Sequence, residues 1–343
     1  MTALKGQVRY YEIWNEPDAG YLATGAAIER TGTPAAGQGR DLYKNNDEYW
    51  LGDRYVPLVI AAREVADEVD GDHINLLGPS WNHDYYGNRG KLCFDRGMHR
   101  YLQLYSIHNY VGDPHSYVFW EEMTNGLYMK TTEDLFKTFN APLPVAVTEW
   151  GVRTYDRPAP GNGFRTRRDG QIFLIKSTFD YLAMERVPIL ILHQLGYNDE
   201  WSLVDKKADG TLIYHPAFDT FQWLCKTFDG KSYQRAALTV EAGPTARGFA
   251  IHLADDTATY VAAWQNQTRT KEGLKPVNEG KVVLKLKGPP DGPYVMEQMD
   301  LVGNVTSSRT VQFSAGYEWT ALLPQATTTA ESEPIIYRFS SRK

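Results

Sequence analysis

The strongest structural signal in the chain is the stretch Tyr10-Tyr-Glu-Ile-Trp-Asn-Glu-Pro-Asp18, in which an apolar run ends in an Asn-Glu-Pro triplet. A short run of this kind, stopped by proline, is typical of a buried strand. A second run, Pro144-Val-Ala-Val-Thr-Glu-Trp-Gly151, is rich in β-branched residues and also ends in a glutamate, with a glycine close behind it. We therefore predict two strands that carry Glu16 and Glu149 at their carboxyl ends.

Two strand-end glutamates indicate the hydrolysis of a glycosidic bond. Breaking an acetal at neutral pH needs one carboxyl group that protonates the leaving oxygen and one that attacks the anomeric carbon. The two groups face each other about 5 Å apart if the configuration is retained. The strand ends of a parallel barrel hold such a pair rigidly. This chemistry needs no metal or cofactor, and we expect none.

The motifs Trp-Asn-Glu-Pro (14–17) and Thr-Glu-Trp-Gly (148–151) together resemble the retaining glycoside hydrolases of clan A. The resemblance implies an α/β fold of the (β/α)8 TIM-barrel type, with the acid/base after strand four and the nucleophile after strand seven. Residues 74–81 resemble strand five, residues 105–110 strand six and residues 189–194 strand eight. Gly-Pro-Ser after strand five and His-Asn-Tyr after strand six are closest to family 39, which holds β-xylosidases and α-L-iduronidases. Families 5, 30 and 51 share much of this pattern.

The resemblance also implies roles for the residues around the pair. Glu16 would be the acid/base, and Glu149 the nucleophile that forms a covalent glycosyl-enzyme intermediate. Asn15 would hydrogen-bond the 2-hydroxyl group of the sugar. Tyr110 would donate a hydrogen bond to Glu149, and His108 would line the floor of the same pocket. A satisfied polar core residue is the alternative interpretation of His108.

The residue that stacks on the sugar is left open by the sequence. Many clan A enzymes carry a tryptophan after strand eight, whereas this chain has Gln194. Trp150, Trp201 or Trp81 would then supply the ring, because flat aromatic side chains pack on the apolar faces of sugars. Each of these tryptophans is explained equally well as part of the core.

The sequence offers fewer strands than a complete barrel needs. The run that resembles strand four begins at about residue 8, and a complete barrel takes about 250 residues. We therefore predict that residues 1–230 form a partial barrel of strands four to eight, with strands one to three absent. An open sheet exposes edge strands, so a second copy of the chain or a partner chain is expected to cover them.

Residues 231–343 have a different pattern, in which short runs alternate with period two between Gly, Pro and Asp turns. This pattern predicts an antiparallel β-sandwich as a C-terminal accessory domain. Strands are predicted at 248–253, 259–264, 281–286 and 319–323, helices at 46–69, 131–139, 166–185 and 214–228, and loops at 19–39, 81–97, 153–163 and 196–211.

Composition bears on partners and location. The net charge of −6 comes with no basic stripe, so nucleic acid and an anionic membrane surface are not expected partners. Nine Trp and 22 Tyr fit a carbohydrate substrate. Cys93 and Cys225 lie too far apart in sequence for a zinc motif or a disulfide framework. Residues 1–6 carry no apolar signal core, and with strands one to three absent this leaves cytoplasmic and secreted locations both open.

Two other interpretations stand beside the active glycosidase. One is a catalytically weak or inactive remnant that binds carbohydrate, and the other is one half of a two-chain enzyme. The sequence favours a xyloside, glucoside or arabinoside of plant or microbial origin as substrate. It does not choose among these sugars or between exo and endo action.

Overall fold

The computed structural model divides the chain into two compact units. The first comprises Met1–Tyr110, Glu121–Trp150 and Arg186–Leu192, and the second Val111–Trp120, Gly151–Glu185 and His193–Lys343. The structure describes residues 1–18, 48–81, 84, 86–111, 126–154, 166–196, 201–235, 238–242, 246–253, 258–265, 268–270, 273–275, 280–286, 292–314, 318–324 and 332–341. The predicted loop at 19–39 and residues 155–163 of the predicted loop at 153–163 lie outside this part of the chain.

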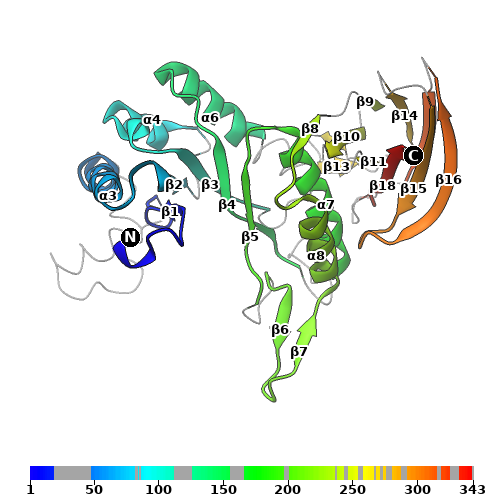
Figure 1. The fold of residues 1–343 in the computed structure, drawn as a ribbon, viewed down its shortest axis with the longest axis horizontal. Helices are drawn as coiled ribbons and strands as arrows, with labels where there is room; N and C mark the ends of the chain where they lie inside the picture. Colours follow the sequence, from blue (N-terminus) through cyan, green and yellow to red (C-terminus); the bar gives the residue numbers. More distant parts are fainter. Residues whose placement is uncertain are drawn as a thin grey trace. The chain divides into compact units, whose positions relative to one another are not determined.

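The first unit is built on a five-stranded sheet whose strands follow one another in chain order (Figure 1). These strands are β1 (Tyr10–Glu12), β2 (Asn75–Trp81), β3 (Leu104–Val111), β4 (Val145–Val152) and β5 (Ile189–Leu192). The pairs β1–β2, β2–β3 and β4–β5 are parallel. Parallel neighbours in chain order with helices between them are the repeating unit of a TIM barrel. All five predicted strands are present.

Short connections and helices join these strands. They are η1 (Thr2–Leu4), the π-helix η2 (Glu48–Tyr55), α3 (Val56–Val69), η3 (Gly71–His73), α4 (Asn88–Asp95), η4 (Met98–Arg100) and α6 (Gly126–Phe139). The helix predicted at 46–69 is present as η2 and α3, and the one predicted at 131–139 begins earlier, at Gly126.

The prediction of a loop at 81–97 is wrong, because α4 lies within it. The carboxylate of Asp84 accepts the backbone N–H of Arg89 at 3.2 Å and that of Gly90 at 2.7 Å. A side chain four residues before the helix therefore satisfies donors that helix starts leave unpaired. Glycine at positions 87 and 90 weakened the helical pattern in the sequence.

The sheet of the first unit is curled into a half barrel. Strands β1 and β4 are separated by two other strands in the sheet, yet Oγ1 of Thr148 on β4 donates to Oε1 of Glu12 on β1 at 2.6 Å. On the neighbouring strands, the hydroxyl oxygens of Ser80 and Ser106 lie 3.1 Å apart. A flat sheet would hold the first and fourth strands about 14 Å apart. The contact therefore requires the curvature of a barrel wall.

Aromatic side chains fix the helices α4 and α6 to the sheet. The ring of Tyr105 on β3 meets Phe94 of α4 at 5.9 Å and Phe136 of α6 at 5.5 Å between centroids, both in edge-to-face geometry. The hydroxyl of Tyr105 accepts the indole N–H of Trp81 at 2.7 Å, and Tyr128 donates to the carbonyl of Trp81 at 2.9 Å. These contacts fix β2 and β3 to each other and to the two helices.

Two long helices lie in the second unit, α7 (Arg167–Ala183) and α8 (Pro216–Phe228). Thr166 and Asp169 form a reciprocal capping box at the start of α7. Almost every residue of α7 is buried, including Lys176, whose ammonium lies 5.8 Å from the ring centre of Trp264 on β11. The helices predicted at 166–185 and 214–228 are therefore present.

A hairpin replaces part of the loop predicted at 196–211, so that prediction is wrong in its second half. Strands β6 (Val204–Lys206) and β7 (Leu212–Tyr214) pair antiparallel. Gly210 occupies the turn with φ of 89°, and its N–H bonds to the carbonyl of Lys207. Asp209-Gly210 is a common hairpin turn sequence, and this was the signal available before the structure.

The rest of the second unit is made of antiparallel sheets. A six-stranded sheet has the order β16-β15-β18-β11-β10-β8, a three-stranded sheet the order β17-β14-β9, and β12 pairs with β13. The strands are β8 (Tyr233–Arg235), β9 (Leu238–Ala242), β10 (Ala246–Leu253), β11 (Ala258–Gln265), β12 (Thr268–Thr270), β13 (Gly273–Lys275), β14 (Gly280–Leu286), β15 (Gly292–Met299), β16 (Val305–Phe313), β17 (Glu318–Leu323) and β18 (Ile335–Ser341).

The two larger sheets share one apolar core. Leu323 of the three-stranded sheet belongs to the same cluster of buried residues as Val261 of β11, Phe313 of β16 and Phe339 of β18. The four strands predicted after residue 231 are all present. The β-sandwich architecture and the domain boundary at 230/231 remain predictions. Among the described residues, no helix is long and apolar enough to cross a membrane.

Asp84 makes the stability of the first unit depend on pH. Burial raises the pKa of this carboxyl to about 6, against the opposing effect of the backbone N–H groups of Gly90 and Arg89. A carboxyl whose pKa is raised by folding stabilises the folded state below its unfolded value of about 4, and this stability is lost as the pH rises through about 6. Between about pH 4 and pH 7, the wild type should lose about 2 kcal/mol of unfolding free energy relative to Asp84→Asn.

Urea unfolding at the two pH values measures this difference. Asp72→Asn, a change at an exposed carboxylate on η3, is the matched control and should follow the wild type. Equal pH dependence in the wild type and Asp84→Asn would contradict the assignment.

Candidate active site

The segment after β1 places Glu16 at the carboxyl end of the sheet. The N–H of Ile13 bonds to the carbonyl of Leu77 on β2 at 3.0 Å, and the hydroxyl of Tyr55 donates to the carbonyl of Ile13 at 2.9 Å. Beyond this anchor, Trp14 and Glu16 both have positive φ, 70° and 44°. Non-glycine residues in this region are strained, and such strain concentrates at functional sites. The anchored backbone fixes the position of the Glu16 side chain, which is buried.

A bulge in β4 positions Glu149. The pairing with β5 shifts register between Val147 and Trp150, so that one extra residue stands on β4. Consecutive side chains of a regular strand point to opposite faces, but a bulge re-aims one of them. The adjacent residues Thr148 and Glu149 can therefore both bond to other strands of the half barrel, Thr148 to Glu12 and Glu149 to Tyr110.

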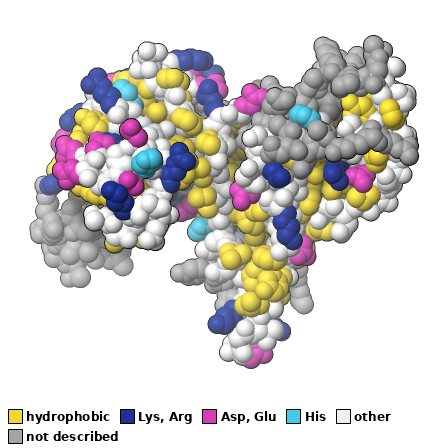
Figure 2. All heavy atoms as spheres, in the orientation of Figure 1, with side chains coloured by type: hydrophobic (Ala, Val, Ile, Leu, Met, Phe, Trp, Pro, Cys, Tyr) yellow, Lys and Arg dark blue, Asp and Glu magenta, His cyan; other side chains and the backbone are white. Residues whose placement is uncertain are grey.

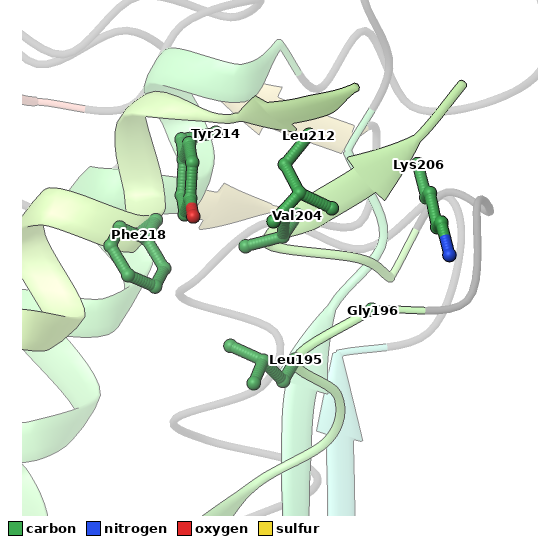
Figure 3. A pocket seen from close by; sticks show the side chains of 7 residues that line it. All are labelled: Leu195, Gly196, Val204, Lys206, Leu212, Tyr214 and Phe218. Carbon is green, nitrogen blue, oxygen red and sulfur yellow. The ribbon is translucent and has the colours of Figure 1, made fainter. Parts of the chain in front are cut away.

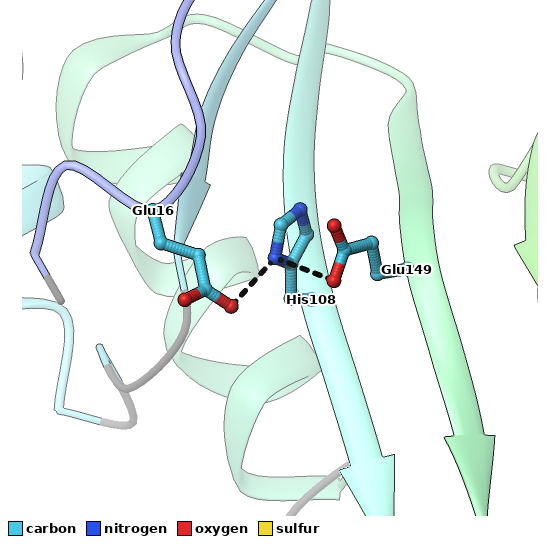
Figure 4. A group of neighbouring side chains, drawn as sticks. All are labelled: Glu16, His108 and Glu149. Atoms are coloured by element: carbon cyan, nitrogen blue, oxygen red, sulfur yellow. Dashed lines mark hydrogen bonds and ion pairs between the residues drawn. The ribbon is translucent and has the colours of Figure 1, made fainter. Parts of the chain in front are cut away.

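His108 lies between the two glutamates (Figure 4). Its Nδ1 is 2.9 Å from Oε1 of Glu16 and 3.4 Å from Oε2 of Glu149. The residue is 2% exposed. Because Nδ1 faces two carboxylates, it must carry a proton, which fixes the tautomer by the chemistry of its partners. Its other nitrogen, Nε2, is buried with no hydrogen-bond partner among the described residues.

Tyr110 completes the cluster from the same strand. Side chains two residues apart on a strand point to one face, so β3 presents both His108 and Tyr110 to the interior of the half barrel. The hydroxyl of Tyr110 donates to Oε2 of Glu149. Burial, the hydrogen bond to Glu149 and the negative charges of Glu149 and Glu16 all raise the pKa of Tyr110, so the phenol keeps its proton and remains a donor.

The carboxylates control the charge of His108. Burial alone lowers the pKa of the imidazole, but the hydrogen bond to Glu16 and the charges of Glu149, Glu12 and Glu16 outweigh it, and the pKa is raised. A positive imidazole offsets part of the negative charge gathered at the site. The charge of His108 therefore affects both glutamates.

The same three residues form a donor set for a cation. One ring nitrogen and two carboxylate oxygens from Glu16, His108 and Glu149 all lie within 4.8 Å of one another. Imidazole and carboxylate are ligands that Zn²⁺ accepts. A cation here would have to displace the proton that Nδ1 of His108 shares with Glu16, so metal binding and proton transfer would compete for one site.

The other predicted site residues are spread over both units. Asn15, the residue before Glu16 in the chain, is exposed to solvent. Trp150 is 1% exposed and Trp81 is fully buried, which fits the packing alternative for both rings. Gln194 and Trp201 belong to the second unit. There the carbonyl of Gln194 accepts the N–H of Leu203 at 3.3 Å.

Trp201 already has polar neighbours within the second unit. The guanidinium of Arg153 lies over its ring at 5.1 Å, and the ring of His193 meets it edge-to-face at 6.4 Å. The Arg153 guanidinium therefore covers one face of the indole.

Sequence reasoning missed two polar contacts near the site. Glu12 bonds to Thr148 and contributes to the charge around His108. Asp18, whose side chain is almost wholly buried, pairs with Arg89 at 3.1 Å. Both acidic residues lie in the first quoted stretch, Glu12 four residues before Glu16 and Asp18 two residues after it. That spacing was a signal for a shared face, but only the curl of the sheet identifies their partners.

Comparisons with solved structures find similar folds in several glycoside hydrolases. No family profile and no curated protein matches the sequence. Among solved structures, a β-porphyranase of glycoside hydrolase family 86 from the human gut bacterium Bacteroides plebeius is similar, with a TM-score of 0.56 and 13% identity. The match covers 98% of this chain and 57% of that one.

Two further structures have similar folds. A family 44 xyloglucanase from Paenibacillus polymyxa matches with a TM-score of 0.52 and 12% identity, over 98% of this chain and 66% of that one. A family 51 α-L-arabinofuranosidase from Bifidobacterium longum matches with a TM-score of 0.51 and 12% identity, over 92% and 73%. The chain thus spans less than two thirds of the first two relatives. The likeness establishes the fold and leaves family 39 a prediction.

The contact between His108 and the glutamates predicts how this histidine titrates. In Glu149→Gln, a negative charge near Nδ1 is removed, so the pKa of His108 should fall. NMR of ¹³C-labelled histidine measures it, with the His108 signal assigned through His108→Gln. Glu133→Gln, at a carboxylate that pairs with Arg186 at 3.3 Å, is the control and should leave the titration unchanged. A His108 pKa that is equal in Glu149→Gln and the wild type would refute the geometry.

Proposed function

We propose that the chain is a retaining O-glycosidase of the clan A type, with Glu149 as nucleophile and Glu16 as acid/base. One observation carries the proposal. The carboxylate oxygens of Glu16 and Glu149 lie within 4.8 Å of each other at the carboxyl ends of parallel strands in a half-barrel sheet. Retaining glycosidases hold their two carboxyl groups about 5 to 5.5 Å apart, whereas inverting enzymes need roughly 6.5 to 9.5 Å to admit a water molecule between them.

The first step forms a covalent intermediate. A carboxylate oxygen of Glu149 attacks the anomeric carbon, the bond from this carbon to the leaving oxygen breaks, and the leaving oxygen takes the proton of Glu16. In the second step, Glu16 removes a proton from water, whose oxygen attacks the anomeric carbon and releases Glu149. The sum is the addition of one water molecule across the glycosidic bond, with two inversions at carbon and therefore net retention.

The neighbouring side chains support these roles. The hydroxyl of Tyr110 donates a hydrogen bond that orients the Glu149 carboxylate. The Nδ1–H of His108 donates to Oε1 of Glu16 and so orients that carboxyl group. Exposed Asn15 stands beside Glu16, in position to bond the sugar hydroxyl next to the anomeric carbon.

The substrate we propose is a neutral glycan, cleaved as a xyloside, glucoside or arabinoside. The chain has a net charge of −6, nine Trp and 22 Tyr, a composition that suits a neutral substrate. The similar structures include a xyloglucanase and an α-L-arabinofuranosidase, which fits this range without choosing within it.

A second candidate is a protein whose activity depends on completion by another chain. The edge strands β1 and β5 of the first unit expose large apolar side chains, among them Tyr10 and Ile191. Exposed edges of this kind are normally covered. A chain that binds sugars in calorimetry, turns none over, and gains activity only on addition of a partner or on self-association would favour this candidate.

Substitution of the two glutamates tests the proposal. Against a panel of aryl xylosides, glucosides, galactosides and arabinofuranosides, Glu149→Gln should lower kcat about 10⁴-fold or more, because no other group can form the intermediate. Tyr110→Phe should lower it about 10²-fold, since one positioned donor is lost. Glu133→Gln is the control carboxylate and should keep wild-type turnover. Full activity in Glu149→Gln would contradict the proposal.

The acid/base role of Glu16 has its own signature. In Glu16→Ala, an aryl glycoside with a good leaving group should still form the intermediate, but hydrolysis of the intermediate should slow about 10²- to 10⁴-fold. Azide needs no base and fits the space that the side chain leaves, so it should restore turnover and yield a glycosyl azide of retained configuration. A glycosyl azide of retained configuration from Glu149→Ala, together with one of inverted configuration from Glu16→Ala, would reverse the two roles.

A further inference from the structure

One hydrogen bond joins the two strands that carry the proposed catalytic pair. Oγ1 of Thr148 on β4 donates to Oε1 of Glu12 on β1 at 2.6 Å. Thr148 directly precedes Glu149 in the chain, and Glu12 lies four residues before Glu16. Neither Glu12 nor Thr148 takes part in the proposed reaction, so the bond between them acts on the site only through the positions of the glutamates.

Strand pairing alone fixes the distance between β1 and β4 only indirectly. β2 and β3 lie between them in the sheet, so three successive pairings separate the two strands. The twist between neighbouring strands ranges from about −10° to −35°, and small differences add up over several pairings. A direct bond between the first and fourth strands removes this freedom, because it fixes the curl of the sheet at one point.

The bond has a short path to Glu16 along β1. The residue after Glu12 is held at both of its backbone groups, because the N–H of Ile13 bonds to the carbonyl of Leu77 at 3.0 Å and its carbonyl accepts the hydroxyl of Tyr55 at 2.9 Å. Glu16 follows this anchor by three residues. A shift of Glu12 relative to β4 is therefore passed to Glu16.

The path to the nucleophile is shorter still. The register of β4 shifts between Val147 and Trp150, so the consecutive residues Thr148 and Glu149 both reach other strands of the half barrel. Thr148 is 6% exposed, which limits the access of water to its hydroxyl. A movement of Thr148 away from β1 carries Glu149 with it.

The separation of the two glutamates decides what they can do. Their nearest oxygens lie within 4.8 Å of each other, on either side of His108 (Figure 4). Retention needs about 5 to 5.5 Å between the two carboxyl groups, and at roughly 6.5 Å a water molecule fits between them. An opening of the curl by about 1 Å is therefore enough to take the pair out of the range for direct attack.

We propose that the hydrogen bond between Glu12 and Thr148 is a brace that sets the separation of Glu16 and Glu149. Glu12 and Thr148 are positioning residues, which act through the backbone of β1 and β4. Without the brace, β4 moves away from β1, and Glu149 is held too far from an anomeric carbon placed beside Glu16. The catalytic consequence rests on the proposed function, whereas the separation itself is a property of the fold.

Crystal structures of the wild type and three variants test the brace directly. Thr148→Val keeps the shape of the side chain but removes the donor, so the nearest oxygens of Glu16 and Glu149 should move apart by about 1 Å or more. Thr148→Ser keeps the hydroxyl and should keep the wild-type separation. Glu12→Leu removes the acceptor at an exposed position, where folding is not at risk, and should widen the pair as well. An unchanged separation in Thr148→Val or in Glu12→Leu would overturn the proposal.

Turnover of the best aryl glycoside measures the consequence. Thr148→Val should lower kcat about 10²-fold and change KM less than about threefold, because a displacement of about 1 Å affects the attack more than binding. Thr148→Ser and Glu12→Gln keep a donor and an acceptor, so their kcat should stay near that of the wild type. Glu12→Leu combined with Thr148→Val should be no slower than either single variant, because both remove the same bond. Losses that multiply in the double variant would refute the brace.

Two controls, one in each unit, test whether the effect is specific. Thr138→Val removes a hydroxyl that bonds to the carbonyl of Asp134 within α6 at 2.7 Å. In the second unit, a pocket of about 730 Å³ has Leu195, Leu212 and Phe218 in its lining (Figure 3), and hydrophobic side chains gather at the base of its hairpin (Figure 2). Leu212→Ala changes this lining.

Both controls should keep the wild-type separation and turnover, and an equal widening of the pair in either would contradict the brace. Full activity in Glu149→Gln would contradict the proposed function alone, because the crystal structures decide on the brace without any turnover.

Discussion

The position of the His108 imidazole between Glu16 and Glu149 is the contact on which the rest of the site depends. A proton on Nδ1 faces an oxygen of each carboxylate, at 2.9 and 3.4 Å, in a place where the histidine is almost fully buried. The nearest oxygens of the two glutamates lie within 4.8 Å of each other, with this donor between them (Figure 4). The pKa of His108 is raised by its neighbours, and a positive imidazole offsets part of the negative charge at the site.

This contact needs three strands to converge. Glu16 follows β1, His108 lies on β3 and Glu149 on β4, so the sheet must curl and each side chain must point inward. The bond between Glu12 and Thr148 joins the first and fourth strands, and the bulge in β4 turns Glu149 toward Tyr110. Rings of Tyr105, Phe94 and Phe136 pack outside the same strands. Strain at Glu16, with φ of 44°, is tolerated because these contacts over-determine the backbone.

Sequence alone predicted the five strands of the first unit well, for a physical reason. Strands that are buried in a parallel sheet are continuous apolar runs, and polar residues at their ends stand out against them. The helix α4 was missed because its cap is supplied by Asp84, which lies outside the helix. The hairpin β6–β7 was missed because its strands are three residues long each.

The partners within the site could not be predicted in the same way. Thr148 and Glu149 are neighbours in sequence, and regular alternation would send them to opposite faces, so the bulge had to be seen. The bond of His108 to Glu16 joins residues 92 positions apart. Trp150 was a candidate for sugar stacking, whereas its burial at 1% exposure follows from its place next to Glu149 on a strand packed on both faces.

The most direct test of the central claim is to trap the intermediate. A fluorinated glycoside that matches the aryl glycoside turned over best would form the ester quickly and release it slowly. Intact mass should then increase by one glycosyl group, and fragmentation should place that group on Glu149. A label on another residue, or turnover that yields the inverted sugar and no label, would contradict a double-displacement mechanism through Glu149.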